Sequence, residues 1–278
     1  MKIYQLHRLC NLIKNYLKLS PVIILMLVIA CQSVPITGRQ QLNLVPSGTV
    51  LSMSNSEYGE FLAKNKAITN TPEAQMVRRV GQNIQHSVER FFVQNNLSER
   101  LNGYHWEFNL VEGKSINAWC MPGGKVVVYT GILPVAKDDA GLAVVVGHEI
   151  AHAVAQHGDE RMSQALLAQM GGVALATALS TKLKETNQLF MSAYGIGTQV
   201  GVLMPYSRLQ ESEADRLGLI FMAMAGYNPR AAVDFWKRMA AKKEGASLPE
   251  FLSTHPADET RIRNLEKLIP EAMQYYKS

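Results

Sequence analysis

The sequence places two histidines and a glutamate at a spacing that suits metal chemistry. The run HEIAH at residues 148–152 follows the apolar stretch 142–146, so we expect it on a buried helix. His148 and His152 are four residues apart, which puts both imidazoles on one helical face, within reach of one ion. Zinc accepts such nitrogens, and Glu149 beside it can take a proton from water. Taken alone, this pattern is also compatible with two buried histidines that only pack in the core and bind no metal.

A catalytic zinc site needs a third protein ligand, and the acidic segment 211–215 is the candidate. Glu211 and Asp215 are four residues apart and share a helical face, so one can bind the metal while the other orients a ligand. Glu213 points elsewhere on this helix. The alternative is an acidic first turn that only complements the helix dipole. His157, five residues after His152, is expected to face away from the metal.

Composition and charge indicate one globular domain that does not bind nucleic acid. The chain has 278 residues, of which 47% are hydrophobic and 18% charged. Its net charge of +5 is concentrated in residues 1–30, which contain four basic residues and no acidic one, so the remainder has 24 basic and 23 acidic residues. No later basic block with interleaved aromatic residues favours nucleic-acid binding.

Residues 1–30 have the layout of a signal peptide, with a basic stretch before an apolar run. The run spans about 12 residues, against the roughly 20 that cross a bilayer as a helix. The sequence around Cys31 resembles a bacterial lipobox, which predicts a lipid on Cys31 and attachment to a membrane. An uncleaved signal anchor is the alternative. Gln32 after the cysteine resembles the outer-membrane sorting pattern.

The rest of the chain predicts an α+β fold that is mainly helical. We expect residues 31–55, rich in small and polar residues, to be a lipidated linker, and ordered structure to begin near Ser56 in a domain over 56–278. Thr71 and Pro72 predict the start of an amphipathic helix. The alternating and β-branched runs between residues 106 and 130 predict a small antiparallel sheet.

Several motifs together resemble the HtpX and CAAX-prenyl-protease family of zinc metallopeptidases. The central match is residues 148–152 followed by Glu211 and Asp215. The other matching segments are Asn117-Ala118-Trp119, Pro122-Gly123-Gly124, Tyr129-Thr130-Gly131, His255-Pro256, Arg261, and residues 35–42, which resemble a segment of soluble bacterial and mitochondrial members. The resemblance covers nearly all of the chain after Cys31.

The resemblance implies a zincin-like fold, one zinc ion per chain and a defined set of site residues. The expected zinc ligands are His148, His152 and Glu211. Glu149 is expected to be the general base, and Asp215 to orient a ligand.

The resemblance also implies roles near the end of the chain and in the sheet. His255 matches a position that in some periplasmic members approaches the metal, either occupying the water position in a resting state or stabilising the tetrahedral intermediate. Arg261 is expected to stabilise the oxyanion or to support that loop. Asn117, Ala118 and Trp119 are expected to form the edge strand that pairs with an extended substrate peptide.

The sequence thus predicts a zinc endopeptidase of the bacterial cell envelope, lipid-anchored at the periplasmic face of the outer membrane of a Gram-negative cell. Its expected partners are protein or peptide substrates, the membrane and the outer-membrane assembly machinery. The alternative is a zinc-binding, chaperone-like module for outer-membrane protein assembly. An integral membrane protease is disfavoured because no later apolar run is long enough to span a bilayer.

Overall fold

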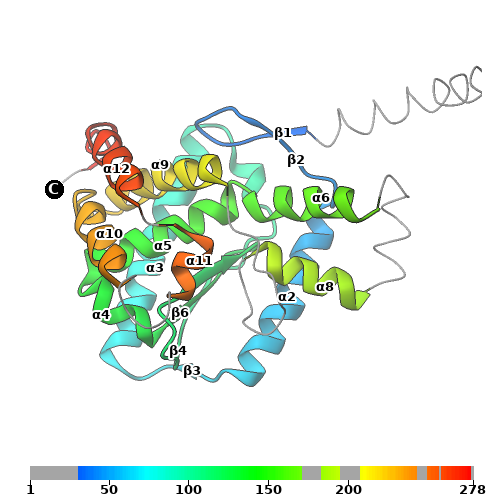
Figure 1. Cartoon of the computed structure of the whole chain (residues 1–278), viewed down its shortest axis with the longest axis horizontal. Helices are drawn as coiled ribbons and strands as arrows, with labels where there is room; N and C mark the ends of the chain where they lie inside the picture. The colour runs from blue at the N-terminus through cyan, green and yellow to red at the C-terminus, as the bar shows by residue number, and fades with distance from the viewer. Residues whose placement is uncertain (1–30, 171–182, 195–206, 243–248, 257, 277–278) are drawn as a thin grey trace, which may run out of the picture.

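A four-stranded sheet lies between two groups of helices (Figure 1). In spatial order its strands are β3 (Ala67–Ile68), β4 (Glu107–Val111), β6 (Lys125–Tyr129) and β5 (Ala118–Met121). β4 and β6 are parallel, whereas the two outer pairings are antiparallel. The expected α+β, mainly helical class with a small sheet is confirmed. After β5 the chain turns back at Gly123 and Gly124, which have φ of 81° and 79°. β6 therefore lies between β5 and β4 and runs parallel to β4.

The computed structural model describes residues 31–170, 183–194, 207–242, 249–256 and 258–276. The expected signal peptide, residues 1–30, lies outside them. Among the described residues, no helix combines the length and the apolar composition that a bilayer span requires. The helices are α2 (Ser47–Lys64), α3 (Pro72–Gln94), α4 (Leu133–Ala136), α5 (Asp139–Val154), α6 (His157–Met170), α8 (Leu183–Ala193), α9 (Arg208–Met224), α10 (Ala231–Ala241), α11 (Glu250–Thr254) and α12 (Glu259–Ala272), with 3₁₀ turns at Ser98–Leu101 and Thr130–Ile132.

The expected helix start at Thr71 and Pro72 is confirmed in α3. The hydroxyl of Thr71 accepts a hydrogen bond from the Ala74 N–H over 3.2 Å, and Pro72 is the first helical residue, where its missing N–H leaves no donor unsatisfied. The apolar stripe that includes Val77, Val80 and Ile84 is fully buried against the sheet and the neighbouring helices. Local propensity and burial therefore agree along this helix.

Each face of the sheet contributes to its own hydrophobic core. α3, α5 and α9 enclose the larger core, and α2, α6 and α8 enclose the smaller one. The edge strand β5 alternates between them: Ala118 and Cys120 belong to the larger core, Trp119 and Met121 to the smaller. α5 therefore lies against the face of β5 that carries Ala118.

Two glycines allow α5 and α9 to cross at very short range. A Cβ atom built on Gly147 of α5 would lie 3.0 Å from the carbonyl oxygen of Gly218 in α9. A Cβ atom built on Gly218 would lie 3.0 Å from the backbone nitrogen of His148. This contact fixes the separation of the two helices that carry the acidic and histidine motifs.

The segment expected to be a linker is packed against the helices. β1 (Cys31–Ser33) and β2 (Gln40–Leu42) form an antiparallel pair, and α2 begins at Ser47. The Gln41 amide donates to the Ala155 carbonyl over 2.7 Å. The expectation that ordered structure begins near Ser56 is therefore wrong. The side chains of Gln41 and Asn43 bind Ala155 and Gln156, between α5 and α6, and the Leu44 N–H donates to Ser163 in α6.

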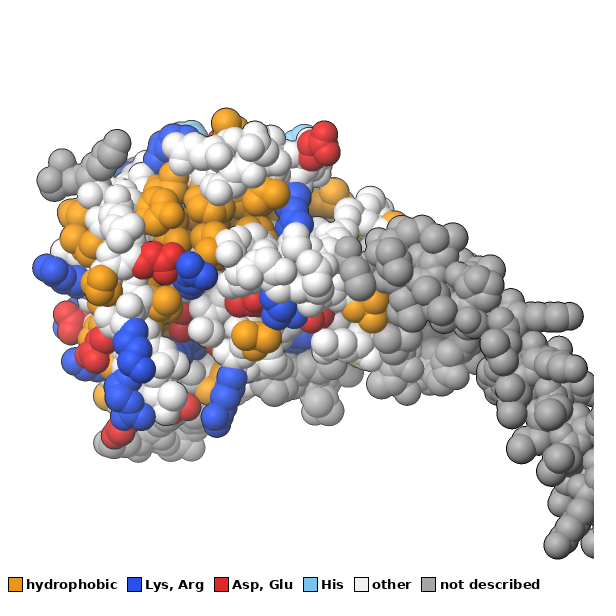
Figure 2. All heavy atoms as spheres, turned by 90° about the horizontal axis from the view of Figure 1, so that it is seen from above, with side chains coloured by type: hydrophobic (Ala, Val, Ile, Leu, Met, Phe, Trp, Pro, Cys, Tyr) orange, Lys and Arg blue, Asp and Glu red, His pale blue; other side chains and the backbone are white. Residues whose placement is uncertain are grey.

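The face drawn in Figure 2 carries both charge signs. Lys and Arg side chains are interspersed with Asp and Glu, and hydrophobic side chains gather in one area of the same face. The net positive charge of the chain is therefore not concentrated on this face.

Candidate active site

α5 places His148 and His152 side by side, as their spacing predicts. Asp138 caps the start of the helix, and its carboxylate accepts a hydrogen bond from the Gly141 N–H over 2.8 Å. Its apolar residues are buried on all sides, so the polar side chains of the motif are held inside the protein. The two Nε2 atoms are 3.1 Å apart, and each histidine is 2% exposed.

α9 adds Glu211 to the pair. The helix starts with a capping box in which Ser207 and Gln210 satisfy each other's backbone N–H groups, so Glu211 lies in the first turn. Its Oε1 atom is 3.2 Å from Nε2 of His152. The candidate third ligand thus reaches the histidines from a neighbouring helix.

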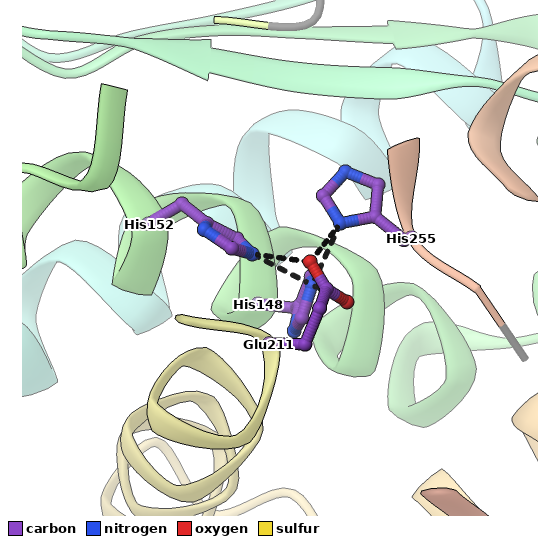
Figure 3. A group of neighbouring side chains, drawn as sticks. All are labelled: His148, His152, Glu211 and His255. Carbon is purple, nitrogen blue, oxygen red and sulfur yellow. Dashed lines mark hydrogen bonds and ion pairs between the residues drawn. The ribbon is translucent and has the colours of Figure 1, made fainter. Parts of the chain in front are cut away.

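His255, which follows α11, completes a group of four donors (Figure 3). Its Nδ1 atom lies 3.2 Å from Nε2 of His148 and 2.8 Å from Oε1 of Glu211. One donor atom from each of His148, His152, Glu211 and His255 lies within 4.8 Å of all the others, and all four side chains are buried.

The chemistry and spacing of these donors fit zinc. Zinc is bound by imidazole nitrogens and carboxylate oxygens at about 2.0–2.2 Å, so two ligands of a tetrahedral ion are about 3.3 Å apart. The observed separations of 3.1 and 3.2 Å among His148, His152 and Glu211 are close to this value. Two imidazole nitrogens at such a distance also need a proton or a cation between them, because their lone pairs repel.

Asp215 and Arg261 support the donors from behind. Oδ1 of Asp215 is 3.1 Å from Nδ1 of His148, the nitrogen that points away from the group. Arg261, from α12, donates to both carboxylate oxygens of Asp215 over 2.6 and 2.9 Å and lies 2.6 Å from Oε2 of Glu211. Its guanidinium stacks over the ring of Trp236 at 3.5 Å. This cation therefore holds both carboxylates in place.

The surroundings shift the pKa values of the two motif histidines in opposite directions. Burial lowers the pKa of His152 well below its usual value, and the hydrogen bond with Glu211 offsets only part of this. Burial also opposes a charge on His148, but hydrogen bonds with Asp215 and Glu211 outweigh it and raise its pKa to about 9. Burial disfavours the charged form of Glu211 too, yet His255 and Arg261 hold its pKa well below the usual range. The group therefore stabilises one positive charge beside an ionised Glu211.

Glu149 lies beside the group and is not one of its four donors. The side chain is buried, and its Oε1 atom is 3.5 Å from Nε2 of His255. Burial raises the pKa of Glu149, while His255 and His148 lower it. A carboxylate with a raised pKa is better able to accept and then return a proton near neutral pH.

The expected substrate strand lies at the edge of the sheet. Ala118 and Trp119 are in β5, and Asn117 directly precedes it with its side-chain oxygen accepting from the Ala118 N–H. α11 lies against the start of this strand, because the Phe251 N–H donates to the Ile116 carbonyl. The indole of Trp119 packs against α2, on the face opposite α5, so this side chain is not available to a strand-like peptide.

His157 contacts the site, and the expectation that it faces away is wrong. Its Nδ1 atom is 2.9 Å from Nδ1 of His152, and its Nε2 atom is 3.1 Å from Oε2 of Glu213. Helical spacing does not apply, because α5 ends at Val154 and Gln156 has a φ of 59°, which turns the chain back. The only sequence signal is a third histidine soon after the motif.

Comparison with known proteins extends the match well beyond the motif. The model of peptidase family M48 matches residues 78–269. Mitochondrial metalloendopeptidase OMA1 of Schizosaccharomyces pombe is 33% identical over 86% of this chain and 66% of its own length, and that of Saccharomyces cerevisiae is 31% identical over 87% and 70%. A putative beta-barrel assembly-enhancing protease of Vibrio cholerae is 33% identical over 56% of this chain and 33% of its own length.

These relatives correct the expected setting. The mitochondrial metalloendopeptidases match most of this chain, whereas the bacterial assembly-enhancing protease matches little more than half of it. The predictions of a bacterial envelope protease and of a place at the periplasmic face of the outer membrane are therefore wrong, and the chaperone alternative assumed the same setting. The predicted setting depended on a few residues around Cys31. This pattern is much shorter than the region that aligns with the mitochondrial relatives. The family match, which covers most of the chain and contains the buried histidine and carboxylate donors, makes this protein a zinc metallopeptidase of family M48.

Proposed function

We propose that this metallopeptidase is an endopeptidase that cleaves protein substrates held as an extended strand beside β5, with Glu149 as general base. The observation that carries the proposal is the position of Glu149, buried next to the four donors and separate from them. Zinc supplies a Lewis acid that polarises the scissile carbonyl and makes water more acidic.

The proposed roles of the ligands follow from the distances. His148, His152 and Glu211 hold the ion, and Asp215 accepts from the outer nitrogen of His148 and so fixes its ring. Glu149 takes a proton from water, and the oxygen of that water forms a bond to the carbonyl carbon. When the carbon–nitrogen bond breaks, Glu149 gives the proton to the leaving amine.

His255 is proposed to occupy the position of water in a resting state. Its Nδ1 atom lies 3.2 Å from His148 and 2.8 Å from Glu211, which supports this role over that of a more distant oxyanion partner. α11, which directly precedes His255, also contacts the start of the proposed substrate strand. A substrate peptide that paired with β5 would therefore compete with α11 for the start of this strand. Displacement of α11 would release His255.

Arg261 is proposed to act as a support and not as an oxyanion partner. Its guanidinium binds the carboxylates of Glu211 and Asp215 and stacks on Trp236, so its donors are already engaged. A cation between two buried carboxylates offsets their repulsion and holds Glu211 toward the histidines.

The decisive experiment compares two variants for zinc content and for cleavage of casein, each with and without chelator. Glu149→Gln should retain one zinc per chain and lose cleavage, whereas His148→Ala should lose both. The control is His86→Ala, because His86 is exposed on α3 and far from the motif in sequence. Full cleavage by Glu149→Gln would refute the role of the general base, and zinc retained by His148→Ala would refute the ligand set.

Lipid attachment at Cys31 is proposed separately from the site. It is supported only by the residues around Cys31, and intact-mass measurement of the membrane-extracted protein beside a Cys31→Ser variant tests it. The wild-type mass alone should carry the added acyl chains, and equal masses apart from the substitution would refute the attachment.

A further inference from the structure

A line of hydrogen bonds leads from His152 to the segment that precedes α2. Nδ1 of His152 lies 2.9 Å from Nδ1 of His157, and Nε2 of His157 lies 3.1 Å from Oε2 of Glu213. Glu213 in turn accepts from the Thr37 hydroxyl over 2.7 Å and from the Arg39 guanidinium over 3.0 Å. His157 and Glu213 are 0% and 3% exposed, so water does not compete with the inner contacts.

The ring protons of this line can point in only one consistent direction. Nε2 of His152 faces the other donors, so the proton of the neutral ring is on Nδ1 and is donated to His157. The Nδ1 atom of His157 then accepts, its own proton is on Nε2, and that proton is donated to Glu213. His152 therefore donates to His157, His157 both accepts and donates, and the line ends on a carboxylate.

Arg39 holds the outer end of the line. Its guanidinium binds Glu213 and also Glu160, at 2.7 Å and 2.8 Å from the two Glu160 oxygens, and the Gln210 amide donates to the same carboxylate. The forked geometry lets one cation position two carboxylates that come from α9 and α6.

The two motif histidines are thus supported in different ways. His148 has a carboxylate directly on its outer nitrogen, that of Asp215 at 3.1 Å. His152 has no carboxylate at this distance on Nδ1 among the described residues, and His157 stands between it and Glu213. A hydrogen bond to the outer nitrogen fixes the tautomer and the orientation of a histidine ligand, and its loss typically weakens metal binding 10–100-fold.

We propose that His157, held by Glu213 and Arg39, is a positioning residue that fixes the ring of His152 as a zinc ligand, and that residues 37–39 are thereby part of the zinc site. The inference depends on the proposed role of His152 as a ligand. It assigns a function in metal retention to the segment before α2, which lies outside the residues matched by the family model.

The experiment measures the rate at which the zinc-loaded protein transfers its metal to an excess of a coloured chelator. In His157→Asn, the side-chain amide places an acceptor near the position of Nδ1, facing His152. In His157→Gln, the longer side chain can contact Glu213 but places no acceptor near the position of Nδ1. His157→Leu can make neither contact. We expect zinc release to be 10–100-fold faster in the Leu and Gln variants and within a few-fold of the wild type in the Asn variant. Arg39→Met leaves His157, His152 and Glu213 unchanged and removes only the cation that holds Glu213. This variant should accelerate zinc release several-fold.

Controls separate the possible explanations. His86→Leu makes the same substitution at an exposed histidine and should release zinc at the wild-type rate. Wild-type release by His157→Leu, or equal acceleration in all three His157 variants, would overturn the inference, because the second pattern indicates loss of packing. Wild-type zinc retention by His152→Ala would instead refute the ligand assignment in the proposed function, so the two failures are distinguishable. If His157→Leu does not fold, the Asn, Gln and Arg39 variants still decide between these outcomes.

Discussion

Substituting Gly218 by alanine should destabilise the protein, although alanine is the better helix former. The new Cβ atom would lie 3.0 Å from the His148 nitrogen and 3.1 Å from both the Gly147 carbonyl carbon and the His148 Cα atom. Ordinary van der Waals contact begins near 3.4 Å, so α5 and α9 would have to separate by the difference, 0.4 Å. All three neighbours are backbone atoms, which cannot move aside by rotating a side chain.

The magnitude follows from two opposing effects. Overpacking in a dense core costs about 1–3 kcal/mol, whereas glycine to alanine in a helix contributes about 0.5–1 kcal/mol of stability. We therefore expect a net loss of about 1 kcal/mol in the free energy of unfolding for Gly218→Ala. The separation of the helices also moves Glu211 and Asp215 away from His148, so zinc should be released faster.

The assay is urea unfolding of Gly218→Ala beside a matched control, Gly59→Ala. Gly59 is inside α2, is exposed, and has no atom within 4 Å of its built Cβ position, so this variant should gain about 0.5–1 kcal/mol. The predicted signature is a change of opposite sign in the two variants, with unchanged denaturant slopes. A Gly218→Ala protein as stable as Gly59→Ala, with wild-type zinc release, would refute the argument that this contact sets the helix separation.

Three further predictions concern stability. Burial raises the pKa of Asp159 to about 7, so the native state binds a proton that the unfolded chain releases, and the free energy of unfolding should fall by up to about 4 kcal/mol between pH 4 and 7. Asp159→Asn retains an acceptor for the Tyr194 hydroxyl and should remove this pH dependence of the free energy of unfolding, measured by urea titration at each pH. An unchanged pH dependence contradicts the raised pKa of Asp159. Trp236→Ala should cost about 3–5 kcal/mol in the same assay, because it opens a cavity under Arg261, and a loss below 1 kcal/mol contradicts this. Free zinc at 100 times its dissociation constant should raise the free energy of unfolding by about 2.7 kcal/mol, and a chelator should reverse the shift in calorimetry; a Tm independent of zinc contradicts a site formed only in the folded chain.

The parts of the molecule that depend on local spacing could be predicted from the sequence. His148 and His152 share a face because they are four residues apart within one uninterrupted helix. Thr71 begins α3 because a hydroxyl at that position satisfies a backbone N–H of the first turn. The approach of Glu211 and His255 was expected from a family resemblance, since spacing alone cannot show which helices cross.

The parts that depend on distant contacts could not be predicted in this way. The position of His157 is set by the left-handed backbone at Gln156, which ends the helical register that the prediction assumed. The parallel pairing of β4 with β6 is decided by the strand between them in the chain, which takes the outer position. Residues 31–55 have the composition of a linker, and only their partners, Ala155 after α5 and Ser163 in α6, show that they are bound.

The contacts of the site join residues that are far apart along the chain, which determines when during synthesis the enzyme can become active. His255 meets His148 across 107 positions, and Arg39 meets Glu213 across 174. Such contacts form late, because closing a long loop costs entropy before the contact offsets it. A growing chain that has exposed only the HEIAH run therefore has neither Glu211, the third ligand, nor Arg261, the cation that supports Glu211. We therefore expect peptidase activity to begin only after the chain has been made and folded as far as Arg261.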